Sequence, residues 1–139
     1  MIAAPTITPT EIYYHPNSEF VADFIGECNF LLCFVEGREG RDVLASVYGR
    51  TVKVRSEMDK TGEAEIVLRP EAIEIADEGQ LPCKVELSCF MGSYQNYHVR
   101  VGDTLVKIAD NCPIGKKTFK VGDDAFISFR SECAHLLET

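Results

Sequence analysis

The chain has 139 residues, 45% of them hydrophobic, and its 22 acidic against 14 basic residues give a net charge of −8. This length suits one modest domain, and a negative field repels nucleic acids and anionic lipid surfaces, so neither is expected as a direct partner. No apolar run approaches the roughly 20 residues of a transmembrane helix, and the N-terminus does not resemble a signal peptide. We therefore expect an intracellular protein.

The first predicted element is a short helix. Thr8 can cap it, Pro9 suits the first helical position, and Glu11 stands where a capping-box carboxylate belongs. Pro16 disfavours a helical conformation at the residue before it, so the helix must end there.

A second short helix is predicted next, with Asn17 or Ser18 as its cap and Gly26 at its C-terminal end. Its apolar residues recur with helical spacing and share one face. They are Phe20, Val21, Phe24 and Ile25. This face would pack either on the domain that follows or on a domain outside this chain.

From Asn29 onward the hydrophobic period changes from helical to two, which predicts β-strands. The unbroken apolar run at 30–35 predicts a strand that is covered on both faces. Further strands are expected at 43–47, 51–55, 64–68, 73–76, 83–89, 97–101, 104–109 and 125–129. We expect Cys83, Val85, Leu87 and Cys89 to share one face, and the tail at 131–139 to add a helical turn.

Turn signals separate these strands. Gly102-Asp103 suits a two-residue hairpin, Gly92 suits a bend or bulge, and a second Val-Gly-Asp stands at 121–123. Many short strands with close turns indicate a closed or nearly closed antiparallel barrel.

Six cysteines raise the possibility of a disulfide framework or a metal site, and their spacing favours neither. The chain has no Cys-x-x-Cys pair, and Cys83 and Cys89 are too far apart along one strand to share an ion. The three histidines are scattered, at His15, His98 and His135. Buried free thiols are the favoured interpretation, and a zinc site assembled from distant cysteines is the alternative.

Several segments resemble one known family, in order and over nearly the whole chain. They are 10–16 with 20–31, Leu68-Arg-Pro-Glu-Ala-Ile73, Phe90-Met-Gly-Ser93 before Tyr97-His-Val99, and the two Val-Gly-Asp turns. Together they are similar to the C-terminal regulatory domain of the ATP-binding subunits of bacterial ABC importers. That domain is of the TOBE (transport-associated OB) type.

The resemblance implies an all-β, OB-like antiparallel barrel at residues 29–139, preceded by a helical linker at 1–28 from an ATPase domain. The sequence contains no Gly-x-x-x-x-Gly-Lys-Ser/Thr loop, so ATP and Mg²⁺ would belong to that ATPase domain, and no cofactor is expected here. We therefore expect part of a longer chain, with a regulatory and dimerising role rather than catalysis. An enzyme built on a Cys–His pair has little support.

The same resemblance implies the partners and the location. They are the ATPase domain of the same subunit, a second copy of the subunit and, indirectly, a membrane permease. The complex would lie in the cytoplasm, peripheral to the cell membrane. The segment Gly26–Leu31 is closest to importers of iron(III), polyamines or phosphonates.

Seven residues are candidates for interface or effector contacts. They are Phe20, Phe24, Arg69, Glu71, Tyr97, His98 and Arg100. Each also has an ordinary structural explanation: Arg69 and Glu71 as a local ion pair, Tyr97 as core packing, and His98 and Arg100 as part of a solvated polar face. Tyr94 is a second aromatic residue that could stack on a ligand.

The alternative function is a small-molecule binding module, similar to the domains of this superfamily that bind oxyanions such as molybdate. Backbone amides at Gly92 or Gly102, with Arg100 or Lys107 nearby, could supply its donors.

Overall fold

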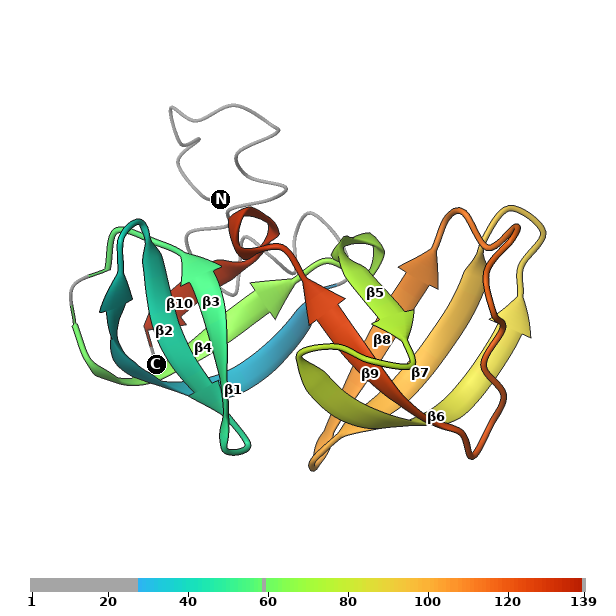
Figure 1. Ribbon diagram of the computed structural model, residues 1–139, viewed down its shortest axis with the longest axis horizontal. Helices are drawn as coiled ribbons and strands as arrows, with labels where there is room; N and C mark the ends of the chain where they lie inside the picture. Colours follow the sequence, from blue (N-terminus) through green and yellow to red (C-terminus); the bar gives the residue numbers. More distant parts are fainter. Residues whose placement is uncertain (1–27, 59, 139) are drawn as a thin grey trace, which may run out of the picture.

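The computed structural model describes residues 28–58 and 60–138 (Figure 1). They form ten strands and two short 3-10 helices, η1 (Pro70–Ala72) and η2 (Ser131–Cys133). The strands are β1 (Asn29–Glu39), β2 (Asp42–Val47), β3 (Arg50–Arg55), β4 (Gly62–Leu68), β5 (Ile73–Ala76), β6 (Leu81–Phe90), β7 (Gln95–Val101), β8 (Thr104–Asp110), β9 (Asp124–Phe129) and β10 (His135–Glu138). The predicted all-β class is confirmed, while the two predicted N-terminal helices lie outside the described residues.

The strands form two five-stranded antiparallel sheets, where a single barrel was predicted. The first has the order β10-β4-β1-β2-β3 and the second the order β5-β9-β6-β7-β8. They lie side by side along the long axis of the molecule (Figure 1). The outer strands of the second sheet, β5 and β8, contact each other, so this sheet is strongly curled. Strand alternation does not identify pairing partners, which is why the prediction of a single barrel missed the division into two sheets.

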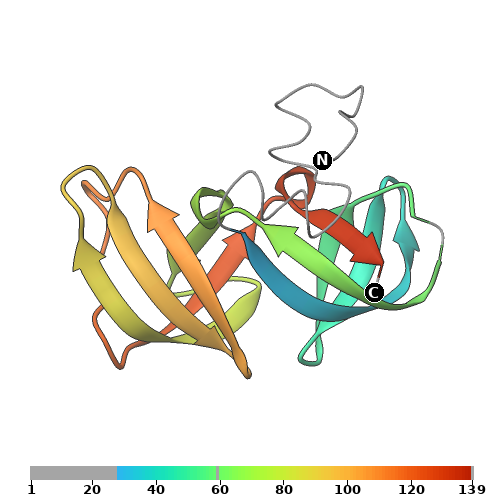
Figure 2. The same ribbon diagram turned by 180° about the vertical axis from the view of Figure 1, so that it is seen from behind.

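The chain passes between the sheets twice. η1 joins β4 to β5, and η2 carries the chain back from β9 to the first sheet. There β10 pairs with β4, and the rear view shows β10, β4 and β1 together in the first sheet (Figure 2). The helical turn predicted within the tail is present as η2, and His135 to Glu138 then extend to complete this sheet.

Alternation places the core as predicted in most strands. In β2 and β3 the inward residues Val43, Val47 and Val54 are fully buried. The apolar run of β1 departs from the prediction, because Leu32 and Phe34 are 67% and 52% exposed on the outer face. One core cluster nevertheless draws side chains from both sheets.

A bulge in β6 overturns the predicted common face of 83–89. Its register with β7 shifts between Val85 and Leu87, which reverses the alternation beyond that point. Ser88 therefore turns toward Phe119 and donates a 2.6 Å hydrogen bond to its carbonyl. Cys89 is exposed on the other side, although Cys83 is buried.

The sheets are also joined where their hairpin tips meet. Tyr48, in the β2–β3 turn, shares a 2.8 Å hydrogen bond with the hydroxyl of Thr104, and its own hydroxyl accepts the N–H of Asp103 at 3.3 Å. Gly102 has φ +58°, and a Cβ there would lie 2.6 Å from the Tyr48 ring. The predicted Gly-Asp hairpin turn is thus confirmed, and its glycine also makes room for this contact.

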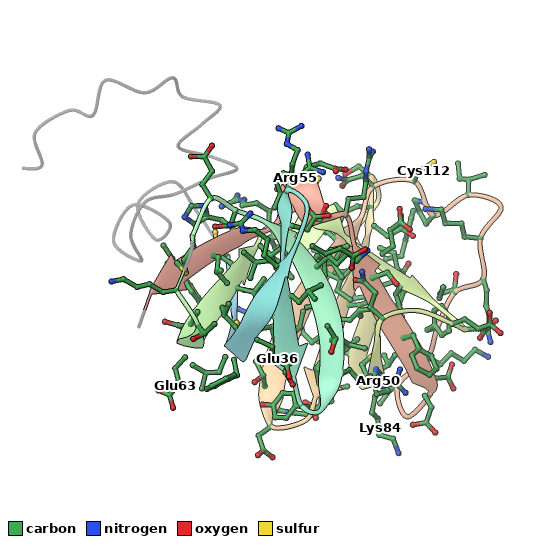
Figure 3. The ribbon with its side chains drawn as sticks, turned by 60° about the vertical axis from the view of Figure 1, so that its left-hand side comes forward. Glu36, Arg50, Arg55, Glu63, Lys84 and Cys112 are labelled. Carbon is green, nitrogen blue, oxygen red and sulfur yellow. The ribbon has the colours of Figure 1, made fainter. Side chains whose placement is uncertain are left out.

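A cation–π contact adds a further link between the sheets. The Arg50 guanidinium carbon lies 5.5 Å from the centre of the Phe126 ring of β9. Figure 3 shows Arg50 at the same end of the molecule as Lys84, whereas Arg55 lies at the opposite end. At that opposite end Arg55 pairs with Asp42 at 3.1 Å.

Among residues 28–58 and 60–138, no helix is long and apolar enough to cross a membrane.

Candidate functional site

A polar pocket of about 510 Å³ lies where η1 meets the outer face of β7 and β8. We call it the junction pocket. Its lining is Arg69, Pro70, Glu71, Tyr94, Asn96, His98, Lys107, Ala109 and Asn111. Alternation explains two of its walls, because the neighbours of Asn96 and His98 in β7 point into the core and leave these two side chains outside. His98 stands directly opposite Lys107 of β8.

Arg69 forms the inner wall of this pocket. Pro70 begins η1, and the backbone of Arg69 is extended just before it, as is usual for a residue that precedes proline. The side chain is buried, and Nε donates to Glu71 Oε1 at 3.3 Å while Nη1 donates to Cys28 Sγ at 3.3 Å. A buried guanidinium needs such a partner, so Glu71 serves to hold Arg69 in place.

Asn29 supports the wall formed by β8. Its Nδ2 donates to the Lys107 carbonyl at 2.8 Å, and its Oδ1 accepts the Lys107 N–H, also at 2.8 Å. The side chain of Asn29 is buried. β8 is an edge strand of the second sheet, so this amide pairs backbone groups that no neighbouring strand of that sheet reaches. The first residue of β1 thereby fastens one sheet to the other.

The structure brings together three of the seven predicted contact residues, Arg69, Glu71 and His98. Tyr97 is a core residue instead, 2% exposed, with its hydroxyl accepting the Phe119 N–H at 3.2 Å and its ring edge-to-face on Phe119. It therefore offers no surface to a ligand, in agreement with its ordinary structural explanation.

Arg100 does not line the pocket, because Glu86 on β6 holds it. Nε and Nη2 of Arg100 each lie 3.0 Å from a Glu86 carboxylate oxygen. This hydrogen bonding lowers the pKa of Glu86 and raises the pKa of Arg100 from their ordinary values. The predicted candidates Phe20 and Phe24 lie outside the described residues.

Sequence reasoning did not single out Asn29, Asn96 or Asn111. Asn29 carried one usable signal, since an amide at the start of an apolar strand needs a partner if it is buried. That partner is 78 residues away in the sequence, so only the fold reveals it.

A second hollow, of about 550 Å³, lies between β5 and β8. Two of its carboxylates face lysines of the loop that follows β8: Asp77 lies 2.8 Å from Lys117 Nζ, and Asp110 lies 3.2 Å from Lys116 Nζ. The hydrogen bond that Lys117 donates to Asp77 raises the pKa of Lys117. These ion pairs close the loop onto the sheet.

The six cysteines are all free thiols, and the described residues contain no group of three or more metal-ligating side chains. Burial raises the pKa of Cys33 and of Cys83 to about 11, with the nearby carboxylates Glu65 and Asp124 contributing less. Cys112 is exposed on the loop after β8, at the margin of the molecule (Figure 3). Buried free thiols were therefore a correct expectation for part of the set.

Curated relatives resemble almost the whole chain. The spermidine/putrescine import ATP-binding protein PotA of Ruegeria pomeroyi is 33% identical over 94% of this chain, and PotA 2 of Pseudomonas aeruginosa is 34% identical over 93%. The Fe(3+) ions import ATP-binding protein FbpC of Rhizobium etli is 37% identical over 75%. The chain spans only 37%, 39% and 30% of the length of these three proteins, respectively.

A solved structure supports the fold. The cytoplasmic molybdate-binding protein ModG, with molybdate bound, superposes with a TM-score of 0.64 over 80% of this chain and 96% of its own. The sequences are 12% identical, so this likeness concerns the OB-like fold alone. The family model of the TOBE domain matches residues 66–137, just over half of the chain. The chain therefore belongs to the TOBE domain family, as found in the ATP-binding subunits of ABC importers.

Proposed function

We propose that this chain is the regulatory domain of the ATP-binding subunit of an ABC importer. The observation that carries the proposal is the similarity along 94% of the chain to a spermidine/putrescine import ATP-binding protein, of which the chain spans about a third. The phosphate-binding loop that nucleotide chemistry requires is missing from the sequence. ATP and Mg²⁺ would thus be bound by the remaining two thirds of such a subunit, and this part would be non-catalytic.

The mechanical role would be to connect two moving ATPase domains through a rigid body. Three links between the sheets support rigidity: the amide of Asn29 on β8, the hydroxyl of Tyr48 on Thr104, and Arg50 on the Phe126 ring. With its sheets fastened at both ends, the domain would move as one unit. Its partners would be the ATPase domain of the same subunit, a second subunit in a homodimer and, indirectly, the membrane permease. The complex would lie on the cytoplasmic side of the membrane.

The solute would be a polyamine or iron(III), because the relatives are named for import of these solutes. This assignment concerns the whole transporter and requires no solute site on the domain itself.

A domain exchange tests the proposal. The corresponding C-terminal region of Ruegeria pomeroyi PotA is replaced by this chain, and polyamine uptake is compared with native PotA and with PotA lacking the region. We expect the chimera to restore a substantial part of the uptake that truncation removes. A chimera that is stably produced and yet no better than the truncated protein would refute a regulatory role of this kind. Light scattering of the isolated chain tests association separately.

The oxyanion site that the sequence suggested around Gly92, Gly102 and Arg100 receives no support from the geometry. Arg100 is held by Glu86, and Gly102 lies against the Tyr48 ring. Lys107, the other residue considered, lines the junction pocket instead.

A further inference from the structure

We propose that the segment 17–26, which the sequence predicts to be helical, docks on the outer face of the first sheet and covers an apolar patch there. This position is one of the two that the sequence leaves open for the apolar face of the segment. Only the consequence rests on the proposed regulatory function: the rigid part of the domain would begin near residue 17 rather than at residue 29.

Five apolar side chains form this patch, which we call the outer patch. Phe30, Leu32 and Phe34 alternate with core residues along β1, and Leu32 and Phe34 are 67% and 52% exposed. Val67 of β4 stands opposite Phe30, and Leu137 of β10 shares a face with Leu32 because both stand opposite the same residue of β4. Large apolar side chains that gather on an outer face mark a contact surface, which single exposed ones do not.

One end of the outer patch already forms a small second core. Val67 and Leu137 are 3% and 7% exposed although they lie on the outer face, and Phe30 and Cys28 pack against them. This cluster is separate from the main core of the two sheets. Because Cys28 is the first described residue, the chain enters the first sheet at the covered end of the patch, and the segment before it is tethered there.

The lengths of the segment and of the patch agree. At about 1.5 Å per residue, a helix at 18–25 is roughly 12 Å long. The strand from Phe30 to Phe34 covers about 13 Å. Residues 26–28 make a connection of ordinary length between a helix and a strand that runs back beneath it, and Gly26 suits the end of the helix.

The spacing of the side chains agrees as well. Phe20 and Phe24 lie about 6 Å apart along such a helix, close to the roughly 7 Å between Leu32 and Phe34 on the strand. An antiparallel arrangement brings these two pairs together and turns the acidic face of the helix toward water. Docking would therefore cover the part of the outer patch that the described residues leave exposed.

The first test compares ¹H–¹⁵N spectra of the 139-residue chain with those of two variants on opposite faces of the segment. Phe24→Ser removes an apolar contact, whereas its matched control, Asp23→Ser, changes the face turned to water. We expect Phe24→Ser to shift the amide signals of Leu32 and Phe34 and to raise the fluorescence of ANS, a dye that binds exposed apolar surface. Unchanged amide signals or unchanged fluorescence in Phe24→Ser would overturn the proposal, and so would equally large effects of Asp23→Ser.

The second test makes the change on the sheet. Phe34→Ser leaves the main core intact, because this side chain lies on the outer face, and we expect it to shift the signals of residues 20–25. Its matched control is Val121→Ser, at a position that is 66% exposed in the loop before β9 and outside the outer patch. Phe24→Ser and Phe34→Ser together should raise dye fluorescence little more than either alone, because both break one contact. Native signals at 20–25 in Phe34→Ser would overturn the proposal.

Two further results would assign the outer patch to another occupant. Signals of Leu32 and Phe34 that shift when the native chain is diluted would mean that a second copy covers the patch. Strong ANS fluorescence of the native chain that Phe24→Ser does not increase would leave the patch to a domain outside this chain. Either result overturns the proposal. The uptake of the PotA chimera depends on neither, so docking of the segment and the regulatory function can fail separately.

Discussion

The substitution Asn29→Leu tests whether one buried amide fastens the two sheets together. It keeps a side chain of similar size and removes both 2.8 Å hydrogen bonds to the backbone of Lys107. The N–H and carbonyl of Lys107 then face a leucine side chain in a half-buried place, where unpaired peptide groups are costly. Asn29→Asp keeps the shape of the side chain but turns a second acceptor toward the same carbonyl.

The expected loss of stability follows from the two hydrogen bonds between Asn29 and the backbone of Lys107. A buried group left without its partner costs about 1–3 kcal/mol, and partial access to water lowers this, so we expect Asn29→Leu to lose about 2–4 kcal/mol of unfolding free energy. In a domain of this size that lowers Tm by on the order of 10 °C. At neutral pH we expect Asn29→Asp to lose at least as much, because one oxygen of its buried carboxylate keeps the Lys107 N–H while the other faces the Lys107 carbonyl without a donor.

Urea unfolding followed by far-UV circular dichroism measures this loss, with an unchanged m-value as the sign that both states keep their compactness. The matched control is Asn111→Ala, at an exposed position, which we expect to change stability by less than about 0.5 kcal/mol. A loss below about 1 kcal/mol for Asn29→Leu would refute the reasoning, since it would mean that water or a rearranged strand satisfies Lys107 equally well.

Four further predictions concern single residues. Tyr48→Phe removes the hydroxyl that joins the hairpin tips and should lower the unfolding free energy by about 1 kcal/mol in urea melts; an unchanged midpoint would show that this contact adds nothing. Gly79→Ala, in the loop between β5 and β6, would place a Cβ 2.5 Å from Ser128 Oγ and 3.1 Å from the Ile127 carbonyl oxygen. We therefore expect urea melts to show a loss of about 1–3 kcal/mol in unfolding free energy. An unchanged unfolding free energy would mean that this loop moves away from β9 without cost. Cys112 should react with a thiol reagent at pH 8 much faster than Cys33, whose pKa burial raises to about 11, and equal rates would contradict that burial. Because this pKa lies above the ordinary 9.0, the stability that Cys33 contributes is full below pH 9 and falls between pH 9 and 11. A Cys33→Ala variant should show a smaller fall over this range, since Cys83 has the same raised pKa and still contributes to it.

The alternation of apolar and polar residues predicted the buried face correctly in strands without a bulge. In β7 the buried residues Tyr97, Val99 and Val101 are those that the sequence assigned to one face. The same reasoning failed in β6, because the bulge after Val85 involves no glycine or proline to announce it. A one-residue slip is enough to turn Cys89 outward.

The candidate site was predictable only in part. The Arg-Pro-Glu segment stood out because proline breaks a strand, and it does form a wall of the junction pocket. The polar residues of β7 and β8 resembled any solvated strand face, and only the folded chain brings them beside Arg69. Asn29 and Lys107 are joined across the two sheets, at a separation that sequence periodicity cannot detect.

The pairing of β10 with β4 has a consequence for how the chain acquires its structure. All of the second sheet is encoded between these two neighbours, so the first sheet stays incomplete until the ribosome has made residues 73–138. Until then the edge of β4 that includes Ile66 and Val67 has no neighbouring strand. Pairing between strands so far apart in the sequence favours slow folding, and the exposed edge invites association between nascent chains. Removal of the last few residues up to Glu138 should therefore impair the folding yield more than their small share of the core suggests.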